Sequence, residues 1–327
     1  MTALALDANL GACPPRALAT AVADLGPELL RRYPDTAPLE AALAARFGIA
    51  PERVAVTAGA DDAIDRVCRA YLGPNRRLLL PRPSFEMLDH FATLVGGGLT
   101  PVPWPHGPFP LDAFLAALGP DTGIVAVVSP NNPTGAVATA ADLRLLAEAA
   151  AGAVVLLDHA YVEYAAHDLT AAALELPNVI VVRTLSKAWG LAGCRIGYAL
   201  GRPPAIARLR DAGGPYPVAA PSVALALARL AGGGDDVRAH VARVRAERAR
   251  LADRLAALGL ESWASEANFV LVECGRRAEA LVAGLAARGV LVRTFPGRPF
   301  LETAVRISLP GAPEPFERLL AALDAAL

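Results

Sequence analysis

Residues 184–190 read Thr-Leu-Ser-Lys-Ala-Trp-Gly, directly after an apolar run, and Lys187 among them is the single lysine of this 327-residue chain. Lysine and arginine together number 31, so arginine supplies the positive charge everywhere else. Arginine stays protonated, whereas a lysine amine can lose its proton and form an imine with a carbonyl compound. We therefore predict that Lys187 is a Schiff-base lysine. The alternative is an ordinary surface lysine.

The charge balance and the cysteines exclude several classes of protein. The net charge is -1, so there is no basic excess to neutralise nucleic-acid phosphates or an anionic membrane surface. The uncharged stretches 92–111 and 212–228 contain glycines and prolines that a regular membrane helix would not tolerate. No signal peptide is recognisable, and the cysteines lack the spacing of a metal site. We expect a cytoplasmic protein with no membrane or nucleic-acid partner.

Apolar strand patterns alternate with helical patterns in the middle of the chain. Between 61 and 72 the apolar side chains fall at helical spacing, and 139–151 begins with Thr139 as a candidate N-cap. Continuous apolar strands alternating with helices are typical of a mostly parallel sheet sandwiched by helices, so we predict an α/β fold. The predicted strands span 54–57, 78–80, 124–128, 153–157, 179–183 and 196–200.

The pattern changes after about residue 220, where a long charged helix is followed by short strands and two further helices. We predict a large domain at 29–220, a smaller α+β domain at 221–327, and an N-terminal arm at 1–28 that forms part of the small domain. The predicted elements of the smaller domain are helices at 235–258, 277–288 and 314–326 and strands at 268–273 and 304–309.

Polar residues follow several of the predicted strands. In parallel sheets, ligands bind beyond the carboxyl ends of the strands. The turn at 57–62 begins a helix, where the backbone N–H groups of Ala60 and Asp61 can bind a phosphate. The stiff loop at 129–135 can present the amide of Asn132 to a ligand oxygen. The alternative for both segments is a structural turn.

Asp158 and the segment 184–195 complete this set. Asp158 ends an apolar strand, where a carboxylate is costly unless it meets a cation such as a protonated pyridine nitrogen. Its alternative is a helix cap. Beside Lys187, the side chains of Thr184, Ser186 and Arg195 are candidate phosphate ligands. Arg195 is alternatively a surface arginine.

Together these segments resemble the fold type I aminotransferases that depend on pyridoxal 5′-phosphate (PLP), and the nearest likeness is to histidinol-phosphate aminotransferase. The motifs are Ser-Pro-Asn-Asn-Pro-Thr-Gly at 129–135, Asp-x-x-Tyr at 158–161, and Thr-Leu-Ser-Lys followed by Gly-Cys-Arg-Ile-Gly at 193–197. The likeness runs over essentially the whole chain, in the same order and at similar spacing.

The resemblance implies a role for each candidate residue. Lys187 would hold PLP as an imine, and Asp158 would pair with the pyridine nitrogen. Asn132 and Tyr161 would hydrogen-bond the ring hydroxyl oxygen, and Phe85 would stack on the ring. The implied ligands of the phosphate are Ala60, Asp61, Thr184, Ser186 and Arg195, together with Tyr33 from the neighbouring subunit of a homodimer with shared active sites.

For the substrate, the resemblance implies that Arg306 binds the α-carboxylate as a bidentate fork, with Asn132 nearby. Arg293 matches a family arginine at the distal end of the substrate, and its alternative is a surface residue. The implied reaction is ping-pong amino transfer between an amino acid or amino alcohol phosphate and a keto acid, with Lys187 and Tyr161 beside the reacting atoms. We expect histidinol phosphate and 2-oxoglutarate as substrates, in histidine biosynthesis.

Three other functions are consistent with the same motifs. One is an aminotransferase for another α-amino acid, another is a phosphothreonine decarboxylase of the same lineage, and a third is a PLP-binding regulator without turnover. The stretch at 9–14 departs from the family because it lacks an acidic residue and has Cys13 where an aromatic residue would help to hold the substrate phosphate. His159 follows Asp158 where the family commonly has glutamate, and we expect it to face away from the ring as a structural residue.

Overall fold

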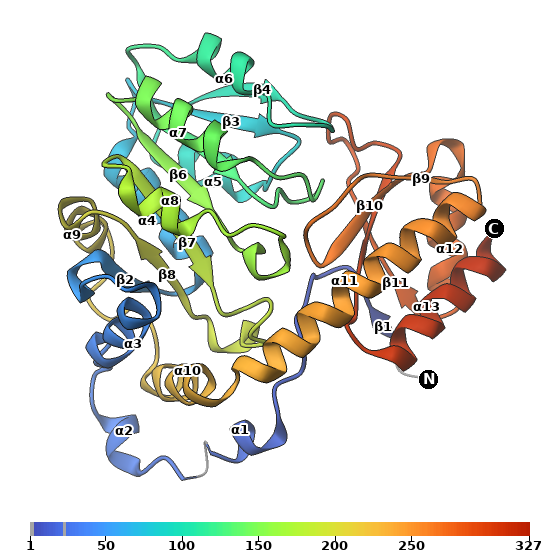
Figure 1. Cartoon of the computed structure of the whole chain (residues 1–327), viewed down its shortest axis with the longest axis horizontal. Coiled ribbons are helices and arrows are strands. Elements are labelled where there is room, and N and C mark those ends of the chain that lie inside the picture. Colours follow the sequence, from blue (N-terminus) through green and yellow to red (C-terminus); the bar gives the residue numbers. More distant parts are fainter. Residues whose placement is uncertain (1–2, 22–23) are drawn as a thin grey trace.

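The computed structural model describes residues 3–21 and 24–327, and its main feature is a seven-stranded sheet (Figure 1). The strand order is β2-β8-β7-β6-β5-β3-β4. Its neighbours pair in parallel, except that β8 is antiparallel to both β2 and β7. The prediction of a mostly parallel sheet is therefore confirmed. The strands are β2 (Val54–Thr57), β3 (Arg77–Arg82), β4 (Gly98–Pro103), β5 (Thr122–Val128), β6 (Val154–Asp158), β7 (Val179–Thr184) and β8 (Gly197–Leu200).

The central strands are apolar throughout because both faces of the large sheet are covered. In β5, Ile124 and Ala126 pack into one hydrophobic cluster, whereas Val125 and Val127 pack into the cluster on the opposite face. This alternation follows from the two-residue period of a strand. One face is covered by α4 (Gly59–Tyr71), α5 (Met87–Leu94) and α9 (Pro203–Asp211), and the other by α3 (Ala37–Phe47), α6 (Leu111–Ala117), α7 (Ala140–Ala149), α8 (Thr170–Glu175) and α10 (Ala220–Gly232).

Local signals account for part of this arrangement. Thr139 caps α7 as predicted, and its hydroxyl and the carboxylate of Asp142 form a reciprocal capping box. The sequence patterns did not indicate β4, which contains Pro101 and Pro103. This strand lies at the edge of the sheet, where a missing N–H does not interrupt a central ladder.

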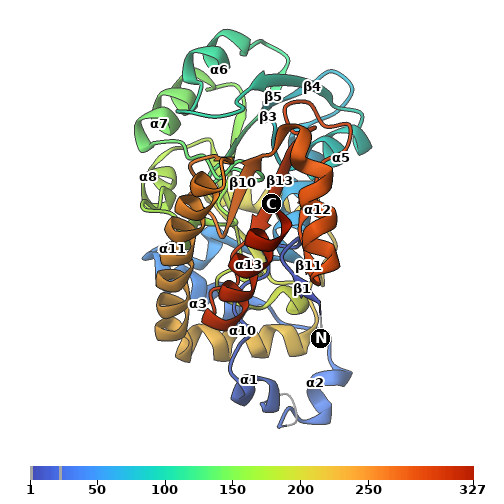
Figure 2. The same cartoon turned by 90° about the vertical axis from the view of Figure 1, so that its right-hand side faces the viewer.

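A second, smaller sheet has four antiparallel strands in the order β12-β13-β10-β9. The helices α12 and α13 pack against each other and lie with α11 on one side of this small sheet (Figure 2). The elements are α11 (Gly234–Ala257), β9 (Glu261–Ser262), β10 (Phe269–Glu273), α12 (Ala278–Ala287), β12 (Arg293–Thr294), β13 (Ala304–Ser308) and α13 (Pro313–Ala326). Predicted domain boundaries near residues 28 and 220 remain predictions.

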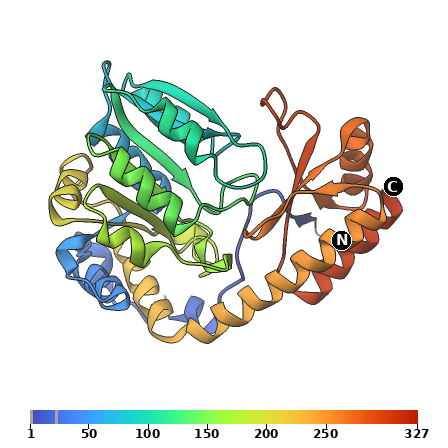
Figure 3. The same cartoon turned by 45° about the horizontal axis from the view of Figure 1, so that its top comes forward.

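The N-terminal segment belongs in space with the C-terminal part of the chain. The short strand β1 (Leu4–Ala5) pairs in parallel with β11 (Val290–Leu291). From there the chain passes between the two sheets toward α1 (Arg16–Thr20) and α2 (Pro27–Arg31) (Figures 1 and 3). This path places residues 7–12 beside the loops that follow the strands of the large sheet.

The carboxyl ends of β5, β6 and β7 meet at one edge of the large sheet, on the side that faces the small sheet (Figure 3). Polar loops that are far apart in the sequence are therefore brought together there. Among the residues that the structure describes, no helix is both long enough and apolar enough to cross a bilayer.

Candidate active site

A cavity of about 250 Å³ lies at this edge of the large sheet. It brings together all of the residues predicted to hold the cofactor within one subunit, and it adds Ala160. The lining residues are Ala60, Asp61, Phe85, Asn132, Asp158, Ala160, Tyr161, Thr184, Ser186, Lys187 and Arg195.

Asp158 is the buried anion of this cavity. It is the last residue of β6 and only 5% exposed, and its Oδ1 accepts a hydrogen bond of 3.0 Å from the backbone N–H of Ala160. Burial raises the pKa of its carboxyl to about 6, although the Ala160 hydrogen bond and the nearby Lys187 charge act in the opposite direction. Asp158 forms no ion pair with any residue that the structure describes. A cationic ring nitrogen bound here would supply the missing partner, so the site fits the pyridine ring of PLP.

Another part of the same cavity is suited to a phosphate. Ala60 and Asp61 lie in the first turn of α4, where backbone N–H groups have no partner within the helix. Gly59 has a φ of +85°, and a Cβ atom there would lie 2.7 Å from Nη2 of Arg195. The missing side chain therefore lets the Arg195 guanidinium approach the start of the helix, where it pairs with Asp61 at 3.3 Å.

Two hydroxyl groups lie at the same end. Thr184 ends β7, and its Oγ1 accepts a hydrogen bond of 3.0 Å from the backbone N–H of Ser186. The two hydroxyl oxygens are 2.9 Å apart. This turn directs the chain from the buried strand into the loop that carries Lys187, and both hydroxyl groups can donate to an anion.

Lys187 lies between two cavities because its side chain lines both of them. Its Nζ is 5.4 Å from the centroid of the Tyr161 ring. Phe85 also lines both cavities, and it follows a turn that is fixed by Asn131, which donates to the Pro83 carbonyl and accepts from the Ser84 hydroxyl.

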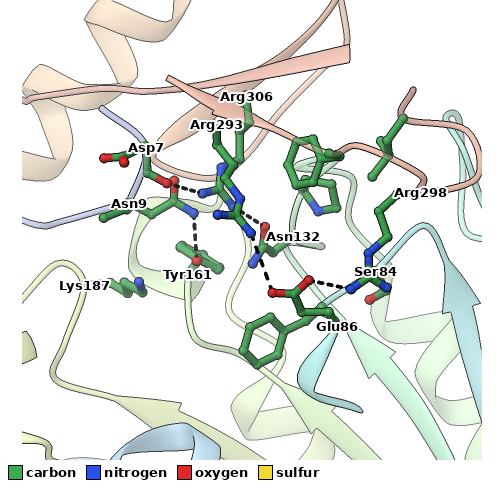
Figure 4. Close-up of a pocket in the computed structure, with 15 residues that line it drawn as sticks. Asp7, Asn9, Ser84, Glu86, Asn132, Tyr161, Lys187, Arg293, Arg298 and Arg306 are labelled. Atoms are coloured by element: carbon green, nitrogen blue, oxygen red, sulfur yellow. Dashed lines mark hydrogen bonds and ion pairs between the residues drawn. The ribbon is translucent and has the colours of Figure 1, made fainter. Parts of the chain in front are cut away.

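The second cavity, of about 220 Å³, contains the predicted substrate residues (Figure 4). Arg306 comes from β13 and is 7% exposed. Its guanidinium donates to Oδ1 of Asn132 at 2.6 Å and to the carbonyl of Asp7 at 2.7 Å. Burial lowers the pKa of Arg306. Both hydrogen-bond partners are neutral groups, so the charge of this arginine remains available to an anion.

The part of the second cavity that we call its distal side combines the charged residues Arg293, Arg298 and Glu86 with the apolar residues Phe295 and Leu301. Arg293, from β12, pairs with Glu86 at 3.7 Å, and Arg298 pairs with the same carboxylate at 2.6 Å. Phe295 and Leu301 line the same cavity. Arg293 was predicted from the sequence, but Glu86 and Arg298 were missed. The position of Glu86 directly after Phe85 was the available signal for it.

The N-terminal segment supplies residues that the sequence patterns also missed. Asn9 is buried, and its Nδ2 donates to the hydroxyl of Tyr161 at 3.0 Å. Its backbone N–H donates to Oγ of Ser308 at 3.1 Å, which ties the segment to β13. Cys13 is exposed and does not line either cavity.

His159 lies away from both cavities, as expected. It is buried, its Nδ1 is hydrogen-bonded to the carbonyl of Ser129, and its Nε2 accepts from the backbone N–H of Leu169 at 3.2 Å. Burial lowers the pKa of His159 to about 4. The ring is therefore a neutral structural connector.

Tyr33 is the one predicted cofactor residue that lies outside these cavities. It is 78% exposed, and its ring stacks on that of Tyr216 with 4.3 Å between the ring centroids. Within a single subunit Tyr33 therefore makes no contribution to the cavity.

Comparison with known proteins agrees with this geometry. Residues 2–323 match the family model described as aminotransferase class I and II. An aromatic amino acid aminotransferase from Corynebacterium diphtheriae is 38% identical over 305 residues, which cover 90% of this chain and 85% of that protein. A histidinol-phosphate aminotransferase from Symbiobacterium thermophilum is 36% identical over 322 residues, which cover 96% of this chain and 87% of that protein.

Solved structures share the fold. The crystal structure of histidinol-phosphate aminotransferase from Sinorhizobium meliloti in complex with pyridoxal-5'-phosphate has a TM-score of 0.89 and 29% sequence identity. The superposition covers 99% of this chain and 90% of that one. The fold of this chain is thus shared with a structure that contains PLP.

Proposed function

The chain belongs to the class I and II aminotransferases, a family with PLP as cofactor, and we propose that its own reaction is amino transfer between histidinol phosphate and 2-oxoglutarate. The observation that carries this proposal is the convergence of Arg293, Arg298 and Arg306 on the cavity that also contains Lys187. Both proposed substrates are anions, and an arginine fork is the side chain best suited to a phosphate or a carboxylate.

The first cavity would hold the cofactor through residues of this chain. Asp158 would pair with the ring nitrogen, and Asn132 and Tyr161 would hydrogen-bond the ring oxygen. Bound there, PLP supplies an electron sink for the charge that develops at the substrate Cα. The phosphate ligands would be Ala60, Asp61, Thr184, Ser186 and Arg195.

Lys187 would carry out the proton transfer. Its Nζ reaches both cavities, so the free amine can take a proton from the Cα of a substrate in the second cavity. Arg306 would orient that substrate by binding the phosphate of histidinol phosphate or the α-carboxylate of the amino acid. Because Arg306 is fixed by Asn132 and Asp7, the substrate Cα would be presented to Lys187 in one orientation.

A second candidate is amino transfer with aromatic amino acids. Phe295 and Leu301 line the distal side of the second cavity and offer apolar surface to an aromatic ring. The relative from Corynebacterium diphtheriae is an aromatic amino acid aminotransferase, which supports the same candidate. The two proposals share the first cavity and differ in the anionic group held by Arg306 and in the ring that lies near Phe295.

The experiment that tests the proposal measures amino transfer from glutamate to imidazole-acetol phosphate beside phenylpyruvate and other keto acids. We expect the imidazole substrate to give the largest kcat/KM. A robust rate with phenylpyruvate and no detectable rate with imidazole-acetol phosphate would replace the first proposal with the second. Release of carbon dioxide from phosphothreonine would instead indicate the decarboxylase.

The role of Lys187 predicts the effect of replacing it. Lys187→Ala should lower amino transfer by roughly 10³-fold or more, because the chain has no other lysine to accept the Cα proton. Lys187→Arg keeps the positive charge and should be equally inactive, since a guanidinium stays protonated. Borohydride reduction followed by mass spectrometry should attach the cofactor to residue 187 of the parent protein alone. Activity in the Ala variant would exclude the mechanism.

A further inference from the structure

We propose that Glu86 is a specificity-determining residue that occupies Arg293 and Arg298 as an internal counter-ion and yields them to a second anionic group on the substrate. This inference rests on the proposed amino-transfer function and concerns the distal side of the same cavity. The ligand class it assigns to that side is a second carboxylate or phosphate on the substrate, in addition to the group held by Arg306.

The first observation is that the ion pairs of Glu86 join the two sheets. Glu86 lies between β3 of the large sheet and α5, whereas Arg293 belongs to β12 of the small sheet and Arg298 to the loop that follows it. The carboxylate contacts Arg298 at 2.6 Å and Arg293 at 3.7 Å (Figure 4). Two guanidinium groups thus share one carboxylate, which leaves a positive charge that a further anion can balance.

The second observation is the contrast with Arg306. That guanidinium is buried, and both of its hydrogen-bond acceptors, a side-chain amide oxygen and a backbone carbonyl, are neutral groups. The distal arginines already have a carboxylate partner. A substrate with a single anionic group would bind Arg306 and leave Glu86 in place, whereas a substrate with two anionic groups must also compete with Glu86.

The third observation is that the Glu86 pairs are weak enough to be displaced. The side chains are 45% exposed for Glu86, 49% for Arg293 and 45% for Arg298. Ion pairs that are open to solvent at this level contribute little to stability. A ligand carboxylate that enters from solvent can therefore replace Glu86, and it forfeits part of its binding energy in doing so. Glu86 would therefore lower the affinity for dianionic substrates relative to the affinity for neutral or aromatic substrates.

The test is a binding measurement that requires no turnover. Isothermal titration calorimetry of the PLP-loaded protein compares glutarate, which has two carboxylates, with 3-phenylpropionate, which has one. Glu86→Gln keeps the size of the side chain and removes the charge. We expect glutarate to bind about five-fold more tightly to this variant, and the affinity for 3-phenylpropionate to stay unchanged.

Control variants separate the proposal from a general change of surface charge. Glu317→Gln, on α13, removes a carboxylate of similar exposure, 58%. In the parent protein this carboxylate pairs with Arg250 at 2.9 Å. It should leave the affinity for both ligands unchanged. Arg298→Gln should weaken the binding of glutarate and leave that of 3-phenylpropionate unchanged. In a variant that lacks both Arg293 and Arg298, the further change Glu86→Gln should no longer strengthen glutarate binding.

Two results would overturn the inference. Weaker glutarate binding to Glu86→Gln would mean that Glu86 supports the site, and equal changes for both ligands would mean that it acts on the whole cavity. Neither result depends on which substrate the protein turns over. A protein that fails to transfer an amino group to imidazole-acetol phosphate still reports on Glu86 through these affinities.

Discussion

At Asp158, burial disfavours the negative charge that the carboxyl group would carry in water. Its carboxylate ends a fully buried strand, and a single backbone N–H, from Ala160, donates to it. Burial raises the pKa to about 6 from an ordinary value of 3.8. Such a side chain weakens the fold of the cofactor-free protein and strengthens it once a cation is bound, because the cation removes the cost of burying the charge.

This conflict predicts a pH-dependent effect of Asp158→Asn on the cofactor-free protein. A carboxyl group with a raised pKa in the folded state contributes stability that is fully present below pH 3.8 and is lost as the pH rises through about 6. At pH 8 the variant should therefore be more stable than the parent by up to about 3 kcal/mol, and near pH 4 the two should be nearly equal. Urea unfolding at the two pH values measures the difference.

The same titration has an internal control. Saturating PLP should stabilise the parent protein more than Asp158→Asn at pH 8, since only the parent supplies a carboxylate for the ring nitrogen. An Asn variant that is less stable by the same amount at both pH values would show that burial of the charge is not the dominant effect.

At the scale of elements, the N-terminal segment and the loop after β7 depend on each other. A Cβ atom at Gly11 would lie 1.6 Å from the backbone oxygen of Lys187, and one at Gly190 would lie 2.1 Å from the backbone oxygen of Ala12. Neither overlap can be relieved by rotation of a side chain, because both clashes involve backbone atoms. Two glycines thus allow the segment that carries Asn9 to lie directly on the loop that carries Lys187.

This contact predicts that Gly11→Ala is harmful although the change adds a single methyl group. The methyl group must push the N-terminal segment away from Lys187 or shift the loop, and we expect a loss of about 1–3 kcal/mol in the free energy of unfolding. The KM for amino substrates should also rise, because Asn9 and Asp7 move with the segment. Urea unfolding and steady-state kinetics measure the two effects.

Gly152→Ala serves as the matched control. Gly152 has no neighbouring atom within 4 Å of the added Cβ, and its φ is not in the left-handed region. It should leave both the unfolding free energy and KM nearly unchanged. If Gly11→Ala behaved like this control, the packing of the segment on Lys187 would be looser than the structure shows.

At the scale of the whole molecule, three exposed apolar side chains belong to residues that line neither cavity. Leu30, Tyr33 and Tyr216 are 73%, 78% and 52% exposed. Tyr33 was predicted to reach the cofactor phosphate of a neighbouring subunit, and its position outside the cavities of its own chain is compatible with such a role. We propose on this basis that the protein is a homodimer with shared active sites.

Mixing two inactive or weakened variants tests the shared site. Tyr33→Phe should lower the affinity for PLP about ten-fold, because it removes one hydrogen bond to a charged phosphate. In a hybrid with a Lys187→Ala subunit, the site that keeps Lys187 receives the intact Tyr33 from its partner. The hybrid should therefore show parent-like PLP affinity in that site, measured by activity at limiting cofactor. No recovery in the hybrid would place Tyr33 outside the partner's site.

Much of the fold and of the cofactor cavity followed from local sequence patterns. Apolar runs such as 124–128 and 179–183 identify buried strands because both faces of each strand are covered. The residues directly after such strands must meet, because the carboxyl ends of adjacent parallel strands lie at one edge. For this reason the sequence alone groups Asn132, Asp158 and Lys187. The edge strand β4 and several short helices escaped prediction because proline and tertiary packing override local propensity there.

The sequence by itself predicts imine chemistry at Lys187, since the single lysine and its neighbouring motifs are positioned by the strand that precedes them. Tertiary structure alone decided the distal side of the substrate cavity. Glu86 and Arg298 are separated by 212 residues, and Asn9 and Tyr161 by 152, so no local pattern links them. Their contacts arise because the small sheet and the N-terminal segment pack against the loops of the large sheet. Substrate choice therefore depends on how the two sheets meet, whereas the cofactor cavity depends mainly on one of them.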